Sequence, residues 1–259
     1  MPLLFPKFVR GRYNGFTNFG NEALAVKSET LRELNAERAA RRPVIVVLDT
    51  ANGEQRLVKA RDIPTDPLRA ELSKQLRMGK SGTVEAGGKK LFLNVYAPTA
   101  RLVIIGAVHI SQALAPLARS LDYDVTVVDP RTAFASPERF PDVPLIAEWP
   151  DVALPQLNVD HYTAFVAVTH DPKIDDPALL HAFERDCFYI GALGSRKTHA
   201  KRGDRLKAQG ASDADIARIH APIGLNIGAV SPSEIAVAIM AEITATLRMP
   251  KELAKENAA

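Results

Sequence analysis

Short apolar segments alternate with helix-like segments through the second half of the chain, and this alternation limits the possible folds more than any other feature. Residues 102–105 are apolar and end at Gly106, and apolar residues then recur at helical spacing over 110–121. Further apolar runs occupy residues 125–128, 145–147, 164–168 and 188–190. Strands that are apolar throughout are covered by helices on both faces, as in parallel sheets. We therefore predict a Rossmann-like, doubly wound parallel α/β sheet over residues 98–248.

A smaller unit with a different pattern precedes this sheet. Helix-forming residues run from 21 to 42, and Pro43 ends the predicted helix. Asp66 and Pro67 predict the N-cap and first turn of another helix. Strand-like runs occupy 44–48, 56–59, 83–86 and 91–96, the last two joined as a hairpin across two glycines. We predict a small α+β domain over 21–97, a basic, aromatic-rich arm over 1–20 and a frayed tail over 249–259.

Composition excludes several classes of protein. With 46% hydrophobic and 24% charged residues and no long apolar run, the chain is not expected to span a membrane. A net charge of +3 is too small to predict a nucleic-acid partner. The single cysteine, Cys187, cannot form an internal disulfide or a thiolate zinc site, and we interpret it as a buried structural thiol. No secretory signal is recognisable, so we expect the protein in the cytoplasm.

The turn after the first strand of the predicted sheet is an altered form of the dinucleotide-binding pattern G-x-G-x-x-G. It reads GAVHIS, which keeps Gly106 but places Val108 and Ser111 where the other two glycines would stand. Asp129 ends the next strand, about 20 residues later, where a ribose-binding acid is expected. Asp129 is predicted either to contact a ligand or to form a strand-end turn. Arg131 either holds a phosphate group or lies in solvent.

A ligand crevice is predicted at the carboxyl ends of the strands. With strand order 3-2-1-4-5, it opens between the loop at Gly106 and the loop of Thr169, His170 and Asp171. His170 and Asp171 suit ligand binding or proton transfer, and equally an ordinary turn and helix cap. His109 either lines the same crevice or only begins a helix.

The stretch FYIGALGSRKTHAKRGDR combines a strand, two glycines and several basic residues. Gly191 and Gly194 allow close backbone approach, and Ser195 is predicted to cap the next helix. The free N–H groups of that helix, with Arg196 and Lys197, would then bind the anionic end of a small ligand. A solvated helix face is the alternative. Two more distal basic residues serve either the ligand or the surface of a client protein: Lys201 and Arg205.

A glycine-rich loop, IHAPIGLNIGA, precedes the last predicted helix. Pro222 and Gly224 in this loop either close over a ligand or form only a tight connection. Ser231 and Glu234 follow in the spacing of a capping box, S-x-x-E. The last helix should therefore begin at this point.

Six ordered motifs resemble the xanthine dehydrogenase accessory protein family, also called the XdhC/CoxI family: RLVIIGAVHIS, VTVVDPRTAF, TAFVAVTHDPKIDD, FYIGALGSRKTHAKR, IHAPIGLNIGA and SPSEIAVAIMAEI. The resemblance implies a Rossmann-like protein that binds molybdenum cofactor, as molybdopterin or its nucleotide form. It also implies assistance in the maturation of this cofactor and its insertion into a molybdenum hydroxylase of the xanthine or carbon monoxide dehydrogenase type. The implied partners are an apo hydroxylase client and a sulfurase or second accessory protein, and we expect a homo-oligomer.

The chain departs from the family pattern in two places. Residues 1–100 contain neither a glycine-serine-alanine-proline-arginine stretch nor a glycine-glycine-cysteine motif, and GAVH stands where G-x-G-H is common. We therefore expect cofactor delivery without a cysteine-dependent step, assign no catalytic residue and leave any metal ligands open. The alternative is an NAD(P)-dependent oxidoreductase with a degenerate dinucleotide-binding turn, and a third class is a partner-binding scaffold.

Overall fold

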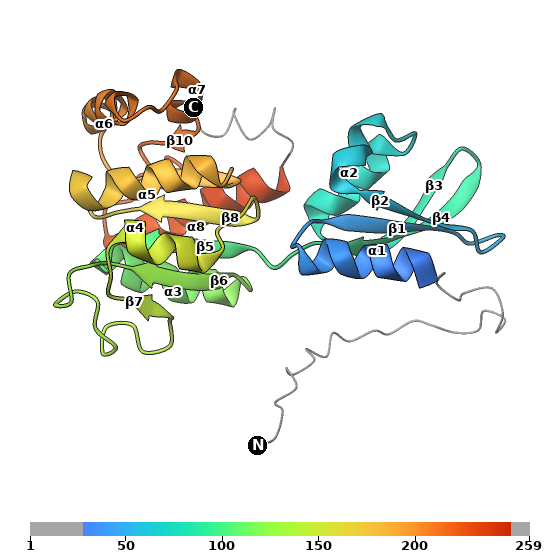
Figure 1. The fold of residues 1–259 in the computed structure, drawn as a ribbon, viewed down its shortest axis with the longest axis horizontal. Helices are drawn as coiled ribbons and strands as arrows, with labels where there is room; N and C mark the ends of the chain where they lie inside the picture. The colour runs from blue at the N-terminus through green and yellow to red at the C-terminus, as the bar shows by residue number, and fades with distance from the viewer. Residues whose placement is uncertain (1–27, 250–259) are drawn as a thin grey trace, which may run out of the picture. The chain divides into compact units, whose positions relative to one another are not determined.

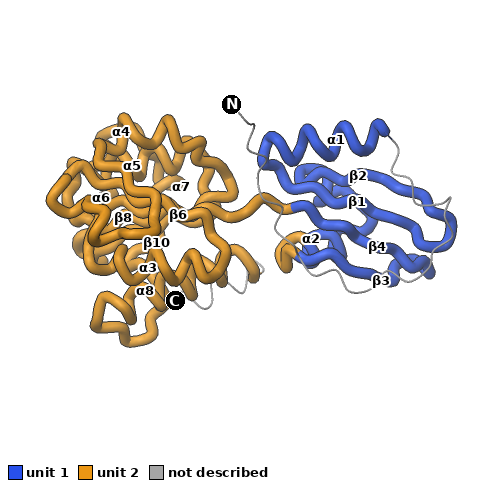
Figure 2. The backbone as a smooth tube through the Cα atoms, turned by 90° about the horizontal axis from the view of Figure 1, so that it is seen from below, with its two compact units in different colours: residues 1–75, 80–96 blue, residues 76–79, 97–259 orange. Residues whose placement is uncertain are grey.

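The computed structural model describes residues 28–249, which divide into two compact units (Figure 2). Unit 1 contains residues 28–75 and 80–96, and unit 2 contains residues 76–79 and 97–249. The predicted arm over 1–20, the first seven residues of the helix predicted from 21, and residues 250–259 of the predicted tail lie outside the described residues.

Unit 1 is built on a four-stranded antiparallel sheet in the order β2-β1-β4-β3. Its elements are α1 (Ser28–Ala39), β1 (Val44–Asp49), β2 (Gln55–Lys59), the 3-10 helix η1 (Ala60–Thr65), α2 (Arg69–Met78), β3 (Gly82–Ala86) and β4 (Lys89–Tyr96). The predicted hairpin is confirmed, since Ala86 pairs with Lys89 and both intervening glycines have positive φ. The regular turns of α2 begin at Arg69, and the carboxylate of Asp66 accepts the N–H of Leu68 at 2.9 Å, the bond expected of the predicted cap.

Unit 2 contains a six-stranded, fully parallel sheet in the order β10-β9-β8-β5-β6-β7. Its elements are β5 (Arg101–Ile105), α3 (His109–Ser120), β6 (Asp124–Val128), β7 (Leu145–Ile146), α4 (Pro150–Ala153), η2 (Leu154–Leu157), β8 (Thr163–Ala167), α5 (Pro172–Glu184), β9 (Tyr189–Ala192), α6 (Arg196–Ala208), α7 (Asp213–Ile216), β10 (Ile219–His220) and α8 (Pro232–Arg248). Numbered along the chain, the strand order is 3-2-1-4-5-6. The predicted doubly wound parallel sheet is confirmed.

Helices cover both faces of this sheet, which explains why its strands are apolar throughout (Figure 1). On one face, α3 and α8 pack against alternate strand residues such as Ile104 and Val166. On the other face, η2, α5 and α6 pack against the intervening residues, including Ile105 and Phe165. All four of these strand residues are fully buried. The sheet is thus the central layer of three, and its carboxyl edge carries the loops of the candidate site.

The predicted start of α8 is confirmed. The side chain of Ser231 accepts the backbone N–H of Glu234, whose carboxylate accepts the N–H groups of Val230 and Ser231 at 2.9 and 2.8 Å. Glu234 is therefore used in the capping box, and we give it no role in the chemistry of the site.

Candidate functional site

The strand order reverses beside β5, which lies between β6 and β8. The chain turns away from the sheet at Gly106, whose N–H donates to the carbonyl of Val128 at 2.8 Å. On the other side of β5, the N–H of Val168 donates to the carbonyl of Ile105 at 3.0 Å. The loops after β5, β6 and β8 therefore leave the sheet at one edge, where open α/β sheets bind ligands.

Gly106 is required by the close approach of the loop that follows β8. Its φ is +113°, and a Cβ atom there would lie 2.7 Å from Cγ2 of Thr169. Ser111, the replacement for the third glycine, is fully buried and donates from its hydroxyl to the carbonyl of Gly106 at 2.5 Å. Val108 is the half-buried N-cap residue of α3, and His109 is exposed at the first position of that helix. The altered turn is thus fixed internally while His109 remains accessible at the edge.

Asp129 is occupied inside the protein. It is 0% exposed, and its carboxylate accepts the N–H of Ala107 at 2.7 Å and two side-chain bonds from Arg131 at 2.9 and 2.7 Å. Burial raises the pKa of Asp129, but the hydrogen bonds from Arg131 and Ala107 outweigh burial and lower it below the ordinary value. Arg131 also lies over the ring of Phe134, 4.5 Å from its centroid. Asp129 therefore forms the strand-end turn and is too buried for the predicted ligand contact. Arg131 is paired with it but is 32% exposed, so its contact with a phosphate group stays a prediction.

The loop after β8 contains an exposed histidine on a strained backbone. His170 has a φ of +64°, which is uncommon outside glycine. The carboxylate of Asp175 holds this conformation by accepting the N–H of His170 at 3.1 Å and the hydroxyl of Thr169 at 2.6 Å. Asp171 caps α5 by accepting the N–H of Lys173 at 3.0 Å. Asp171 is thus the helix cap that its sequence context also allowed, while the imidazole of His170 faces solvent.

The two glycines after β9 permit different close contacts. A Cβ atom on Gly191 would lie 2.5 Å from Cδ1 of Ile223, so this glycine admits the loop that follows β10. Gly194 has a φ of +134°, and a Cβ there would lie 3.0 Å from the side chain of Thr198. Ser195 is the N-cap of α6, as predicted, because its hydroxyl accepts the N–H of Thr198 at 3.2 Å. The strand therefore turns sharply into α6 at the edge of the candidate site.

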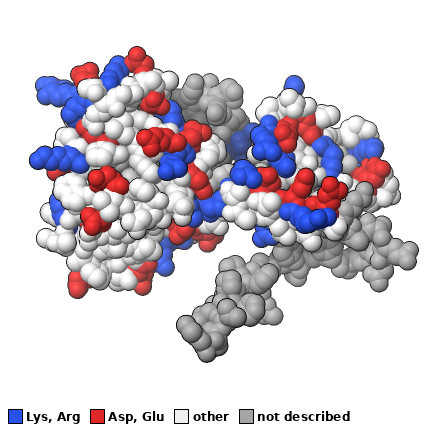
Figure 3. All heavy atoms as spheres, in the orientation of Figure 1, with Lys and Arg blue, Asp and Glu red and all other residues white. Residues whose placement is uncertain are grey.

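The first turn of α6 is accessible and basic. Arg196 and Lys197 are both exposed, and they directly follow the N-cap. The helix has 13 residues, so its unpaired N–H groups and positive dipole end add to these two charges. On the face drawn in Figure 3, basic side chains project from the corner of unit 2 where α6 lies, with acidic side chains beside them. This arrangement suits a phosphate or another small anion.

Arg202 is a buried arginine behind the turn that leads into α6, and the sequence did not reveal it. It is only 2% exposed, and its Nη2 donates to the carbonyl of Leu193 at 2.8 Å. Its Nε and Nη1 have no hydrogen-bond partner among residues 28–249. Burial lowers the pKa of Arg202. Burial also raises the pKa of Asp175, and it outweighs the hydrogen bond from Thr169 and the charge of Arg202, which both lower that pKa. A buried positive charge therefore supports the loop that leads into α6.

Arg205 does not present a free charge to a partner. Its guanidinium forms two bonds with the buried carboxylate of Asp176, at 2.6 and 3.0 Å. Such a bidentate pair tethers α6 to α5. Arg205 thus has a structural role, and its predicted contact with a ligand or client surface stays a prediction, as does that of Lys201, which is exposed on the same helix.

Pro222 and Gly224 belong to a loop that packs on α8. The bond between Ala221 and Pro222 is cis, and Pro222 is exposed. Gly224 has a φ of +88°, and a Cβ atom there would lie 3.0 Å from the backbone of Ala238. Its N–H donates to the carboxylate of Glu242 at 2.8 Å. Gly224 thus sets the position of the loop, and Pro222 is the accessible one of the two.

Cys187 is buried, as predicted. It is 4% exposed and precedes β9, so it lies at the amino end of that strand and away from the carboxyl edge. Burial raises the pKa of its thiol to about 12. The thiol is therefore protonated at neutral pH and is a poor nucleophile. Within residues 28–249, no group of three or more His, Cys, Asp or Glu side chains is arranged to hold a metal ion.

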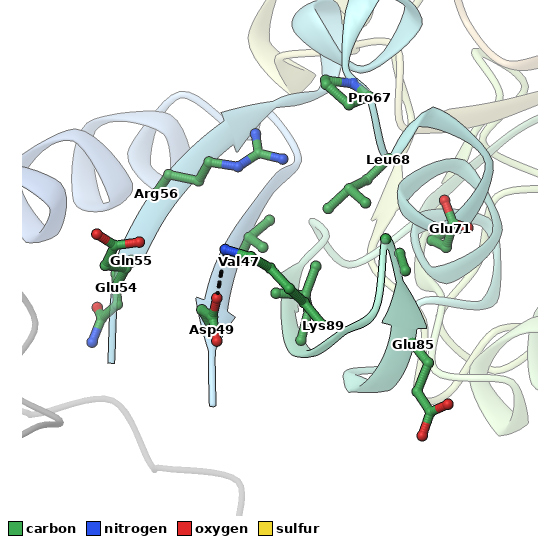
Figure 4. A pocket seen from close by; sticks show the side chains of 13 residues that line it. Val47, Asp49, Glu54, Gln55, Arg56, Pro67, Leu68, Glu71, Glu85 and Lys89 are labelled. Carbon is green, nitrogen blue, oxygen red and sulfur yellow. Dashed lines mark ion pairs between the residues drawn. The ribbon is translucent and has the colours of Figure 1, made fainter. Parts of the chain in front are cut away.

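Unit 1 has a hollow of about 850 Å³, and none of the predicted site residues line it (Figure 4). Three of its charged side chains form ion pairs: Asp49 with Lys89 at 3.0 Å, and Arg56 with Asp66. We assign no ligand to this hollow. None of the helices in the described part of the chain has the length and apolar character needed to cross a membrane.

Three curated proteins are similar to part of this chain. It is 34% identical over 159 residues to the uncharacterized protein YqeB of Escherichia coli (strain K12), covering 61% of this chain and 29% of that protein. It is 33% identical over 157 residues to a protein of Bacillus subtilis (strain 168) that is named a probable subunit of xanthine dehydrogenase. The match covers 60% of this chain and 46% of that protein. It is 31% identical over 157 residues to the molybdenum cofactor insertion chaperone PaoD of Escherichia coli (strain K12), covering 61% and 43%. The matches span less than half the length of these relatives.

A solved structure shares the fold. The crystal structure of a xanthine dehydrogenase from Bacillus halodurans matches with a TM-score of 0.62 and 23% sequence identity, covering 87% of this chain and 68% of that chain. In sequence, residues 102–243 match the family described as the XdhC Rossmann domain. This match covers more than half of the 259 residues and, apart from the first residue of β5, includes all the strands of the parallel sheet. The chain therefore belongs to the XdhC family.

Proposed function

We propose that the protein binds molybdenum cofactor at the carboxyl edge of the parallel sheet and assists its maturation and insertion into a molybdenum hydroxylase. The observation that carries this proposal is the exposed, basic N-terminus of α6 in a chain of the XdhC family. The pterin of this cofactor ends in a phosphate or a nucleotide diphosphate, which suits such a helix terminus. The relatives named for xanthine dehydrogenase and for cofactor insertion support the same role.

The residues of this edge suit binding and delivery of a cargo. Arg196 and Lys197 would hold the anionic end of the cofactor, with N–H groups of the Gly194–Ser195 turn beside them. His109 and His170 are exposed at neighbouring strand ends and would contact the rest of the ligand. The metal and its dithiolene ligands supply the redox chemistry of the mature hydroxylase, and this chain would orient the cofactor for transfer.

The proposed client is an apo molybdenum hydroxylase of the xanthine or carbon monoxide dehydrogenase type. A second accessory protein or a sulfurase is a further proposed partner. Self-association into a homo-oligomer belongs to the same proposal. Activation of purified apo hydroxylase, with and without this protein, would test the client assignment.

Replacing Arg196 or Lys197 by alanine should weaken cofactor binding about ten- to a hundredfold. Each variant would lose a charge-assisted contact of about 1.5–3 kcal/mol. Equilibrium titration with molybdenum cofactor isolated without oxygen would measure the dissociation constants. Lys201→Ala is the matched control for Lys197→Ala, since Lys201 is also exposed but lies one turn farther along α6.

The control variant should bind like the parent protein, and all three variants should retain the parent melting temperature. Equal binding by the parent, Arg196→Ala and Lys197→Ala would remove the helix terminus from the proposed site. Steady hydride transfer from NADH or NADPH without pterin affinity would instead support the oxidoreductase alternative.

A further inference from the structure

A buried carboxylate on α8 collects hydrogen bonds from three separate segments of unit 2. Glu242 is 5% exposed and accepts the hydroxyl of Tyr189 at 2.6 Å, the N–H of Gly224 at 2.8 Å and a ring bond with Nδ1 of His220 at 2.9 Å. Burial raises the pKa of Glu242, but the bonds from His220 and Tyr189 outweigh burial and lower it. The carboxylate is therefore ionised at neutral pH and can only accept, so Nδ1 of His220 carries the hydrogen.

This bond fixes the orientation of the His220 ring. The ring also lies against Tyr189, with centroids 4.6 Å apart and an interplanar angle of 31°. The side chain is 29% exposed, and Nε2 has no hydrogen-bond partner among residues 28–249. A carboxylate that holds one ring nitrogen while the other is free is the arrangement that orients histidines for ligand binding.

His220 also lies at the edge that carries the candidate site. It is the last residue of β10 and pairs in register with Gly191 of the neighbouring parallel strand β9. Strand β9 leads through Gly194 into the N-terminus of α6. The carboxyl ends of β9 and β10 thus reach the same edge of the sheet. The His220 ring lies on the face covered by α8, against Tyr189 and Glu242, whereas the body of α6 packs on the opposite face.

We propose that His220 is an anion-binding residue of this edge, and that its Nε2 donates a hydrogen bond to a phosphate oxygen of the ligand. Glu242 and Tyr189 are positioning residues, because they act through the orientation of the ring. Since Nδ1 already donates to Glu242, a second donor bond from Nε2 requires the protonated ring, whose positive charge also suits an anion. For the identity of the ligand, this inference rests on the proposed binding of molybdenum cofactor.

The test compares two forms of one fluorescent probe, the stable oxidised pterin derived from molybdenum cofactor, with and without its phosphate ester. The parent protein should bind the phosphorylated form more tightly. His220→Asn leaves a donor near the position of Nδ1 but removes Nε2, and it should reduce this preference by roughly tenfold. Glu242→Gln should reduce it less. A change in folding alone would weaken the binding of both forms of the probe alike and leave the ratio of their two dissociation constants unchanged.

A matched control is available in His161→Asn. His161 is exposed, and its Nδ1 also faces a carboxylate, that of Asp186 at 3.3 Å. It precedes β8, however, and therefore lies at the amino edge of the sheet. His161→Asn should keep the parent preference for the phosphorylated probe. An equal preference in the parent and His220→Asn would overturn the inference.

A second measurement separates this inference from the proposed function. Inorganic pyrophosphate should shift the ring resonances of His220 in the NMR spectrum of the full chain and leave those of His161 in place. If the parent protein binds neither pterin but shows this shift, the proposed function is overturned and the anion site is retained. The absence of a shift at His220 would overturn the anion site even if the pterin binds.

Discussion

Glu242→Ala is expected to lower the free energy of unfolding by about 3 kcal/mol, because the donors of Tyr189, His220 and Gly224 would lose a shared buried acceptor. Chemical denaturation followed by circular dichroism would measure the change. The control is Glu234→Ala at the exposed start of the same helix, which removes only part of a capping box. It should cost about 1 kcal/mol. Equal losses for the two variants would show that the buried network adds nothing beyond an exposed cap.

The contribution of Glu242 to the free energy of unfolding should also depend on pH in a defined direction. The pKa of Glu242 is lowered in the folded protein, so the ionised carboxylate stabilises the fold above its unfolded pKa of about 4.3. This stabilisation is lost as the pH falls through the folded value. The stability difference between the parent and Glu242→Gln should therefore shrink in acid. A difference that grows as the pH falls would contradict the assigned hydrogen-bond network.

Gly106→Ala should destabilise the protein by about 3 kcal/mol and impair ligand binding. The alanine would have a positive φ, and its Cβ would meet Thr169 at 2.7 Å. Gly210→Ala is the matched control, because Gly210 also has a positive φ of +98° but no atom within 4 Å of the added Cβ. The control should cost about 1 kcal/mol, which is the conformational strain alone.

Thermal unfolding and pterin titration of both glycine variants would separate strain from crowding. Equal losses of stability at the two positions would show that the close approach of the loop after β8 contributes nothing. Parent-like affinity in a folded Gly106→Ala protein would show that this turn lies outside the binding site.

The parallel sheet was predictable because its signals are local. Most of its strands are apolar over three to five consecutive residues, and Ser195 and Ser231 carry their capping partners within the next three positions. The hairpin of unit 1 follows equally from two adjacent glycines between strand-like runs. The cap predicted at Asp66 is also local, since its carboxylate accepts the N–H of Leu68 just before the regular turns of α2 begin.

The candidate site was only partly predictable, because its polar contacts join residues far apart in the sequence. Glu242 contacts His220 and Tyr189, which precede it by 22 and 53 positions. The basic run predicted a charged α6 but could not show that Arg205 pairs with Asp176, 29 positions earlier. Asp129 had the expected ribose spacing, yet a bond to Ala107 22 positions earlier and the side chain of Arg131 occupy it.

The burial of Arg202 was predictable from its spacing to a core leucine on the same helix. Arg202 and Leu206 are four residues apart and therefore share a helix face, and Leu206 belongs to the core on one side of the sheet. A charged residue on that face must be buried with partners or serve a site. Lys197, Lys201 and Arg205 are also spaced four residues apart and share a different face of the same helix.

The identity of the small molecule that the protein carries would test cofactor binding without any assumption about the client. The protein would be purified gently and without oxygen from a molybdenum-replete host, and the molecules released on denaturation would be identified by mass spectrometry. We expect a pterin bearing a phosphate or nucleotide, with reduced amounts in Arg196→Ala and unchanged amounts in Lys201→Ala. Release of a nicotinamide nucleotide, or of no pterin from the parent protein, would contradict the proposed function.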